Sequence, residues 1–322
     1  MADFKVVIVM STYNGEKFLP DQLDSFIAQE YQNWRLIVHD DGSTDSTMQV
    51  LSDYAAKDNR IRVLENDGHL GIKRSFLSLL GQEEGDFYAF SDQDDVWHAN
   101  KLSVLVTRMK QEDPVVPTLI YSRFVEINGQ GEQLPGSPHK PIYSTALKDL
   151  LLINTVTGCT CMLNRALREC LLKRLSDLDL DQIHMHDWWA ALVAAALGQV
   201  IFVDAQLVSY RQHKTNVLGA PGNDGFATRL GRFMKFRESR IVSSGSRQAG
   251  QLLALYGSHL RAMDRPLVAG VASLFKGWAP IRKIRFLKTQ QLYIHSKFLN
   301  IELTLLLWMT PWDRARVFAH NA

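Results

Sequence analysis

The 322-residue sequence predicts an α/β fold in which helices flank a mostly parallel sheet. Short apolar runs alternate with segments of helical spacing over roughly the first hundred residues, which is the strand and helix order of such folds. The apolar runs are unbroken, as is typical of parallel strands that are buried on both faces. Each run ends in a polar loop, and in open α/β sheets ligands bind beyond the carboxyl ends of the strands.

The first part of the chain predicts a strand, helix, strand order that continues to a fourth strand. Strands are expected over residues 6–10, 35–38, 61–64 and 87–90. Helices are expected around residues 19–27, over a segment with Met48, Leu51 and Tyr54 on one face, and over residues 71–80. Ser43 or Thr44 is expected to cap the second of these helices.

The pattern changes after Pro114. Strands are expected over residues 118–127, 157–163, 200–203 and 207–210, and a helix is expected over residues 188–196. Residues 128–143 are rich in Gly and Pro, which predicts a surface loop. The region after residue 225 is predicted to form several helices. No internal repeat is visible in the sequence.

The net charge of +2 is an average over two unlike regions. Residues 226–322 hold 16 Lys and Arg against 4 Asp and Glu, whereas residues 1–225 hold 20 basic and 30 acidic residues. A hydrophobic fraction of 46% with 22% charged residues is enough to bury a core, which excludes global disorder and fibrous folds. We therefore expect an acidic body, residues 1–225, and a basic helical region, residues 226–322.

The three cysteines are too few and too irregularly spaced for a disulfide framework or a four-ligand zinc site. Cys159 and Cys161 alternate as in a buried strand, and a reducing cytoplasm fits this usage. No secretory signal is visible at the start of the chain. The two longest apolar stretches, 188–203 and 298–309, are shorter than a membrane span, so we expect a protein that is not integral to a membrane.

Three carboxylates stand within four residues at Asp92, Asp94 and Asp95, directly after the fourth predicted strand. Such charges repel one another unless a cation lies between them, and oxygen ligands favour a hard divalent ion. Mg²⁺ or Mn²⁺ held here would also bind substrate phosphates. The alternative is a solvated acidic turn that caps the next helix.

Further polar residues follow the other predicted strands. Asp40 and Asp41 could accept hydrogen bonds from a base or a ribose, or could simply cap a turn that contains Gly42. More polar or aromatic residues lie in the loop after the first strand and at the start of the third helix. The basic residues among them could face either phosphate oxygens or solvent. The residues in these two places are Thr12, Tyr13, Asn14, Lys73 and Arg74.

Asp187 precedes a strongly apolar helix and is either its N-cap or a general base in a pocket walled by indole rings. Trp188 or Trp189 could offer a flat apolar face to a sugar. His213 follows the last predicted strand and is a candidate metal ligand or phosphate partner, or a structural histidine.

Taken in order, these segments resemble the family-2 glycosyltransferases with the nucleotide-sugar-binding GT-A fold, over about residues 4–216. The resemblance is carried by Ser-Thr-Tyr-Asn-Gly (11–15), Asp-Asp-Gly-Ser-Thr-Asp (40–45), Ser-Asp-Gln-Asp-Asp-Val-Trp (91–97), His-Asp-Trp-Trp (186–189) and Tyr-Arg-Gln-His (210–213). The form of the third segment is most similar to the bacterial rhamnosyltransferase-type branch, which builds surface polysaccharide.

The resemblance implies a role for each matching residue. Asp92 and Asp94 would be the Asp-x-Asp motif for the metal and the diphosphate, with Asp95 beside them, and His213 would reach the metal or the diphosphate. Asp187 would be the catalytic base, although His186 stands where the family commonly has Glu. The implied nucleoside-binding residues are Thr12, Tyr13, Asn14, Asp40, Asp41 and Asp67.

The implied activity is inverting transfer of a sugar, with rhamnose as the first choice, from a nucleoside diphosphate to a hydroxyl of a growing surface polysaccharide or a lipid-linked glycan. Residues 1–225 would be the catalytic domain, with a nucleotide-sugar half, 1–113, and an acceptor half, 114–225. Two alternatives remain open. The first is a sugar nucleotidyltransferase, which usually has a phosphate loop rich in Gly and in Lys or Arg; residues 11–15 lack such a loop. The second is a non-catalytic module that binds a nucleotide or a carbohydrate, and such a module would not need Asp187.

The basic region mixes cationic and aromatic residues, which suits an anionic membrane surface. We expect a cytoplasmic protein that docks on the inner face of the cell membrane, and the alternative is that the basic helices pair with the acidic body or with a second subunit. No nucleic-acid motif accompanies the charge. The residues concerned are Arg229, Arg232, Phe233, Lys235, Phe236, Arg237, Arg240, Arg282, Lys283, Ile284, Arg285, Phe286 and Lys288.

Overall fold

The fold is given by a computed structural model that describes residues 4–65, 68–136, 143–213, 237–275 and 280–292, with the backbone alone along 237–242. Strands in the described residues form one eight-stranded sheet in the order β3-β2-β1-β4-β7-β6-β8-β5. The strands are β1 (Val6–Thr12), β2 (Trp34–Asp40), β3 (Ile61–Val63), β4 (Phe87–Ser91), β5 (Val96–Trp97), β6 (Thr118–Ile127), β7 (Cys161–Asn164) and β8 (Gln199–Arg211).

The sheet is parallel from β3 to β4, as the sequence predicts. Beyond β4 it becomes mixed, because β7 runs antiparallel to both β4 and β6, and β5 runs antiparallel to β8. The parallel half aligns the ends of β1 and β2, since Thr12 pairs with Asp40. The loops after β1, β2 and β4 therefore meet at one edge, where a ligand is expected.

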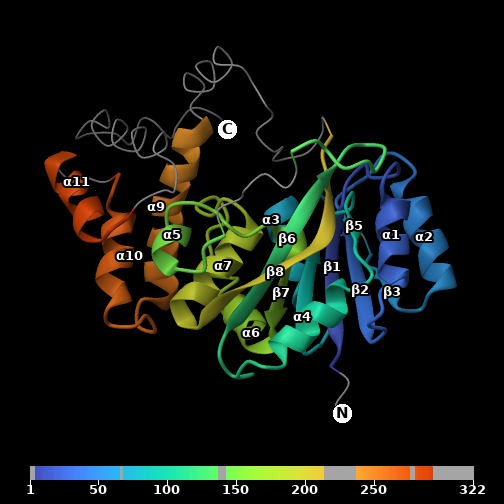
Figure 1. The fold of residues 1–322 in the computed structure, drawn as a ribbon, viewed down its shortest axis with the longest axis horizontal. Helices are drawn as coiled ribbons and strands as arrows, with labels where there is room; N and C mark the ends of the chain where they lie inside the picture. The colour runs from blue at the N-terminus through green and yellow to red at the C-terminus, as the bar shows by residue number, and fades with distance from the viewer. Residues whose placement is uncertain (1–3, 66–67, 137–142, 214–236, 276–279, 293–322) are drawn as a thin grey trace.

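Helices cover both faces of the sheet (Figure 1). In the view of Figure 1, α1 and α2 lie on the right of the sheet, and α9, α10 and α11 form an outer layer on the left. The helices are α1 (Leu19–Ile27), α2 (Thr47–Lys57), α3 (Ile72–Leu79), α4 (Lys101–Met109), α5 (Leu147–Leu150), α6 (Arg165–Lys173), α7 (His186–Leu197), α9 (Arg237–Tyr256), α10 (Asp264–Ala272) and α11 (Pro280–Thr289).

Alternation along the strands divides the core into two clusters. Along β1, Val7 and Val9 pack with α3, α6 and α7, whereas Val6, Ile8 and Met10 pack with α1 and α4. All five side chains are fully buried, because this strand has apolar cover on both faces. The unbroken apolar run in the sequence is explained by this double burial.

Three local predictions are wrong. Helix α2 begins after Ser46, so neither Ser43 nor Thr44 is its N-cap, and Met48 is 40% exposed. The expected strand over 157–163 begins as a 3₁₀ turn, Gly158–Thr160, which also contains Cys159. The two strands expected over 200–210 are the single strand β8.

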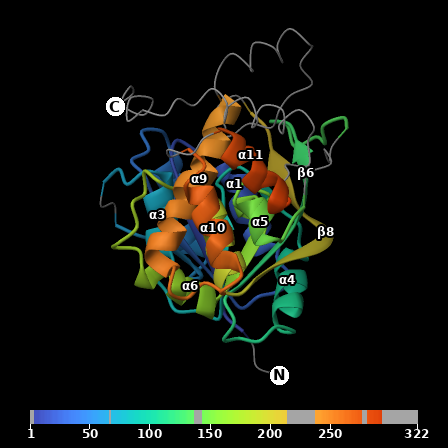
Figure 2. The ribbon, with the colours of Figure 1, turned by 90° about the vertical axis from the view of Figure 1, so that its left-hand side faces the viewer.

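The C-terminal helices share the core of the α/β body. Leu252 and Tyr256 of α9 and Val268 of α10 belong to the same hydrophobic cluster as Trp189 of α7. Gly245 lies so close to α5 that a Cβ atom there would come within 2.2 Å of the Leu151 carbonyl oxygen. Figure 2 shows α9 and α10 with α3 on one side and α5 on the other. The predicted boundary near residue 225 falls outside the described residues.

No helix in the described part of the chain is both long and apolar enough to cross a membrane.

Candidate functional site

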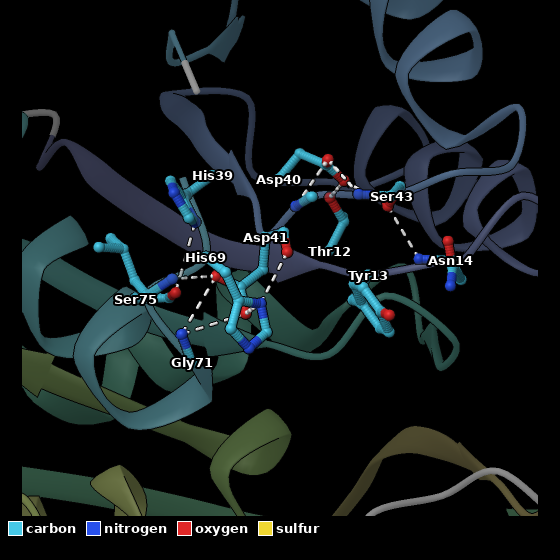
Figure 3. A network of polar contacts seen from close by, with 12 residues as sticks. Thr12, Tyr13, Asn14, His39, Asp40, Asp41, Ser43, His69, Gly71 and Ser75 are labelled. Atoms are coloured by element: carbon cyan, nitrogen blue, oxygen red, sulfur yellow. Dashed lines mark hydrogen bonds and ion pairs between the residues drawn. The ribbon is translucent and has the colours of Figure 1, made fainter. Parts of the chain in front are cut away.

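The loop after β1 presents its backbone and one aromatic ring at the edge of the sheet. Tyr13 is 53% exposed, and its ring meets the ring of His69 edge-on, with 6.2 Å between the ring centroids (Figure 3). Asn14 adopts a positive φ of 47°, and its side-chain oxygen accepts a hydrogen bond from the Thr44 backbone at 2.8 Å. The exposed ring can therefore stack on a flat ligand while the backbone below it is fixed.

Asp40, at the end of β2, is a structural acceptor for this loop. Its carboxylate accepts hydrogen bonds from the Thr12 hydroxyl at 2.8 Å and from the Ser43 hydroxyl at 2.6 Å. It also accepts the backbone N–H of Ser43 at 2.8 Å. Asp40 is 2% exposed. Asp40 and Thr12 therefore shape the loop at the predicted nucleoside edge, because their polar atoms already bond to one another.

Asp41 joins the same edge to the start of α3. Its carboxylate accepts the backbone N–H groups of Leu70 at 2.6 Å and Gly71 at 3.1 Å, and it lies 3.0 Å from the His69 ring (Figure 3). A negative charge here is favoured by the positive end of the helix dipole. Asp67 lies outside the described residues.

A cavity of about 640 Å³ lies between β3 and α3, beside this network. Its lining includes His39, Leu64, Leu70 and Ser75. Nδ1 of His39 lies 3.3 Å from the Ser75 hydroxyl. The volume is that of a small-ligand pocket, and it adjoins the backbone that Asp41 binds.

The acidic loop after β4 is paired with the end of β8. Asp94 Oδ2 lies 2.6 Å from His213 Nε2, so two residues 119 positions apart in sequence are brought into contact. Both side chains are less than one-fifth exposed. The ring of His213 also packs against Phe18, with 4.9 Å between centroids.

Asp92 and Asp95 form the inner part of this loop. Burial, together with the neighbouring carboxylates, raises the pKa of Asp92 well above its usual value and that of Asp95 to about 7. Asp95 Oδ1 accepts the Arg211 backbone N–H at 3.0 Å. No hydrogen-bond partner for Asp95 Oδ2 is found within the described ranges. Carboxylates that raise one another's pKa suit a bound divalent cation.

Oxygen ligands for a hard cation are therefore present. Asp92, Asp95 and Cys159 each place one ligand atom within 4.8 Å of the other two. Burial raises the pKa of the Cys159 thiol well above its usual value, so it stays protonated and is a poor ligand for Mg²⁺ or Mn²⁺. The two carboxylates, with Asp94 and His213 beside them, fit such an ion, and the thiol does not.

Two buried basic residues lie around the acidic loop, and no role was predicted for either from the sequence. Arg211 is 2% exposed and donates to the Asp94 carbonyl at 2.7 Å and to the Asp21 carboxylate at 2.8 Å. Lys101 is fully buried and donates to the Cys159 carbonyl at 2.5 Å, and burial lowers its pKa to about 7. A lysine in an amphipathic helix pattern gives no sequence signal that it points inward.

Asp187 is the second residue of α7, whose N-cap is Met185, so the capping alternative is wrong. Its carboxylate accepts the Gly158 N–H at 3.0 Å, the Trp188 N–H at 2.6 Å and the Asn154 amide at 3.3 Å. It is 8% exposed, and burial raises its pKa to about 6. A carboxylate with this pKa is ionised at neutral pH and basic enough to accept a proton.

The tryptophans beside Asp187 do not form an open sugar platform. Trp188 and Trp189 are 0% and 1% exposed, and the Trp188 indole N–H donates to the Leu150 carbonyl at 2.6 Å. The expectation that one of these rings offers a flat apolar face to an acceptor sugar is wrong, since both rings fill the core between α7, α5 and α9. His186 stacks on Phe76 of α3, with ring centroids 3.9 Å apart.

Lys73, predicted to face phosphate oxygens, instead binds backbone carbonyls. Its ammonium group donates to the carbonyls of Leu180 and, at 3.1 Å, Ile183. These residues lie just before α7, so Lys73 contacts the segment that leads to Asp187. The sequence could not show this, because the two segments are more than 100 residues apart.

The fold is that of the GT-A glycosyltransferases, as two solved structures show. A fragment of S. aureus TarS in complex with UDP-GlcNAc is similar over 90% of this chain and 93% of its own, with a TM-score of 0.51 and 16% identity. The mannosyltransferase PcManGT from Pyrobaculum calidifontis, in complex with GDP-Man and Mn²⁺, is similar over 96% and 86%, with a TM-score of 0.54 and 17% identity. At these identities the likeness concerns the fold.

The sequence comparisons give the family. The model of glycosyl transferase family 2 matches residues 7–172. WfgD of Escherichia coli, a UDP-Glc:alpha-D-GlcNAc-diphosphoundecaprenol beta-1,3-glucosyltransferase, is 31% identical over 193 residues, which are 59% of this chain and 69% of WfgD. The dTDP-rhamnosyl transferase RfbG of Shigella flexneri is 25% identical over 223 residues, 66% of this chain and 74% of RfbG. The chain belongs to glycosyl transferase family 2. It spans about two thirds of the length of WfgD and of two other curated relatives.

Proposed function

We propose that this glycosyltransferase catalyses metal-dependent, inverting transfer of a sugar from a nucleoside diphosphate to a hydroxyl of a surface polysaccharide or lipid-linked glycan. One observation carries the proposal. Asp187, a buried carboxylate with a pKa of about 6, lies close enough to the acidic loop that its charge raises the pKa of Asp92. This electrostatic proximity supports a site in which Asp187 accepts a proton beside a group that binds the diphosphate.

Each half of the site has its own task in the proposed reaction. Tyr13, Asn14 and the edge shaped by Asp40 and Asp41 bind the nucleoside. Asp187 removes the proton of the acceptor hydroxyl as that oxygen attacks the anomeric carbon from the face opposite the diphosphate. A single displacement of this kind inverts the anomeric centre, and the diphosphate leaves with the electron pair of the broken bond.

We propose Mg²⁺ or Mn²⁺ as the cofactor, bound by Asp92 and Asp94 with Asp95 and His213 in support. When bound, such an ion neutralises the charge that develops on the leaving diphosphate. The support lies in the crowded carboxylates, the buried Asp95 oxygen and the Asp94 to His213 contact.

The donor is proposed to be a deoxythymidine-diphosphate-linked rhamnose. This choice is supported by the Ser-Asp-Gln-Asp-Asp-Val-Trp segment and by the relation to RfbG, which is named a dTDP-rhamnosyl transferase. The similarity to WfgD, whose named acceptor carries a diphosphoundecaprenol, supports a lipid-linked acceptor. We assign the donor to residues 1–113 and the acceptor to residues 114–225.

We expect release of a nucleoside diphosphate when the protein is incubated with the correct sugar nucleotide, an extract of lipid-linked glycans and Mn²⁺. The panel should include dTDP-rhamnose, UDP-glucose, UDP-GlcNAc and GDP-mannose, each with and without EDTA. Turnover with dTDP-rhamnose that EDTA abolishes is the expected result. Turnover with another donor overturns the choice of sugar, and turnover that survives EDTA overturns the metal dependence.

We propose that α11 docks the enzyme on an anionic membrane surface. Its Arg282, Arg285 and Lys288 are exposed, and Ile281 is 74% exposed beside them. The helix contains no acidic residue. Basic residues with an exposed apolar side chain suit the headgroup region of an anionic bilayer, where a lipid-linked acceptor is held. Lys283, which the sequence also placed in the membrane-facing set, is only 2% exposed, so that part of the expectation is wrong. The side chains of the remaining basic residues in that set, between residues 229 and 240, lie outside the described part of the chain.

We expect the triple variant R282Q/R285Q/K288Q to lose binding to vesicles that contain phosphatidylglycerol. Each basic residue near such a surface contributes about 1 kcal/mol, so the partition coefficient should fall roughly 100-fold. The matched control is R35Q/K57Q/K110Q, which removes three exposed charges elsewhere on the surface. Equal binding of both triple variants in a sedimentation assay would contradict docking through α11.

A further inference from the structure

The segment between α6 and α7 ends at the proposed base. Residues 174–185 form no regular element, and α7 begins at His186, so Asp187 follows immediately. The position of Asp187 therefore depends on what holds this segment. Contacts from two helices far away in the sequence do so, one on each side.

The first contact comes from α3. Lys73, in the first turn of α3, donates to the carbonyls of Leu180 and Ile183, the latter at 3.1 Å. The ammonium group lies near the carboxylates of Asp179 and Asp181, and burial lowers its pKa. The two carbonyls thus occupy N–H donors of the Lys73 ammonium group that a contact with phosphate would need.

The second contact comes from α9. The Gln248 side-chain oxygen accepts the His184 N–H at 3.4 Å, and the Ser244 hydroxyl lies 3.4 Å from the His184 ring. The Gln251 side-chain oxygen accepts the Asp179 N–H at 3.3 Å. Individually these bonds are long, but together they connect α9 to the middle of the segment at Asp179 and to its end at His184.

The far end of the connection is the nucleoside edge. Asp41 accepts the N–H groups of Leu70 and Gly71, directly before α3, and Phe76 of α3 stacks on His186. One short helix therefore contacts the nucleoside edge with its amino end and the approach to Asp187 with its side chains. The two halves of the proposed active site are linked through it.

We propose that Lys73 is a positioning residue for the Asp187 base, which fixes the segment before α7 against α3 and α9. This rests on the proposed function, in which Asp187 accepts the proton of the acceptor. Lys73 has no contact with the donor in this assignment, in contrast to the phosphate-binding role expected from its place in the sequence. The geometry predicts that its loss affects turnover and leaves nucleotide affinity intact.

The test compares K73M with K73R and with R74M, which removes the neighbouring exposed charge. For K73M we expect kcat to fall about 10- to 100-fold, as for a misplaced catalytic group, with the Kd of the nucleoside diphosphate unchanged within about twofold. The acid limb of the pH–rate profile should move to lower pH, because a loosened segment lets water reach Asp187 and lowers its pKa. K73R should recover most of the activity, since a guanidinium can also donate to both carbonyls.

Two results would overturn the proposal. A Kd for the nucleoside diphosphate that weakens 10-fold or more in K73M, with kcat retained, would make Lys73 a phosphate ligand instead. If kcat and the acid limb of K73M are both unchanged, Lys73 has no effect on catalysis and the positioning proposal is wrong. Partial unfolding would lower the apparent kcat by reducing the amount of active enzyme, but it would not move the acid limb, so the limb separates mispositioning from a general loss of stability.

A measurement without substrate separates this proposal from the proposed function. Hydrogen exchange over residues 178–188 should be faster in K73M than in the wild type and unchanged in R74M. If the wild type transfers no sugar but this difference appears, the proposed function fails while the Lys73 contact stands. If K73M exchanges as slowly as the wild type, the positioning proposal itself is wrong.

Discussion

The Asp187→Asn variant is expected to transfer sugar about 10³-fold more slowly than the wild type, because the asparagine amide cannot accept the proton of the acceptor hydroxyl. Nucleotide affinity should be unchanged, since the contacts of Asp187 are with Gly158, Trp188 and Asn154 and with no residue of the nucleoside edge. The measurement is single-turnover transfer with saturating donor, together with calorimetric binding of the nucleoside diphosphate.

The pH dependence of the transfer rate tests the role of Asp187 a second time. Burial raises the pKa of Asp187 to about 6, so the wild-type rate should rise with pH through that value as the base loses its proton. The residual activity of Asp187→Asn should lack this limb. Asp177→Asn, an exposed position ten residues earlier, is the matched control and should keep both the rate and the limb. Wild-type turnover in Asp187→Asn would remove this residue from the role of base.

The Asp94→Ala variant is expected to weaken metal-dependent binding of the donor by at least about 10- to 100-fold, because Asp94 is a proposed metal ligand and the loss of even an outer partner of a ligand costs that much. The change removes a carboxylate from the acidic loop and leaves His213 without the oxygen 2.6 Å from its Nε2. Calorimetry with the nucleoside diphosphate, with and without Mn²⁺, measures the effect. Without the metal, affinity should change little.

The control for this prediction is Asp53→Ala, which removes an exposed carboxylate on α2. His213→Ala should reproduce part of the Asp94→Ala effect, and the double variant should be no worse than the stronger single variant if the two side chains act as a pair. Equal Mn²⁺ enhancement of binding in wild type and Asp94→Ala would show that the ion is held elsewhere.

The strands and their polar ends were predictable from the sequence because both follow from local patterns. The unbroken apolar run at residues 6–10 predicts a buried parallel strand that ends at the following loop, and β1 confirms it. The Asp94 to His213 contact also agrees with the expectation that both residues lie at one site. Their roles in metal binding stay predictions.

Side-chain direction was not predictable, because it depends on contacts between distant segments. Trp188 and Trp189 looked like a pocket wall in sequence, yet the close packing of α5 and α9 turns both inward. Lys73, at the start of a predicted helix, was predicted to contact phosphate, yet its partners are the backbone carbonyls of residues 180 and 183. Lys101 carried no signal, because a buried lysine is rare and its acceptor, the Cys159 carbonyl, lies 58 residues away.

Recombination between members of this family meets a constraint at α9. A crossover near residue 225 would join an α/β body to foreign helices, and the new partner would need a glycine where Gly245 meets the Leu151 carbonyl. It would also need side chains that fit around Trp189 and Tyr256. Exchange ahead of α6 keeps α7 and α9 from the same parent. A crossover at that point would pass on α7, with Asp187, and the C-terminal helices as one block.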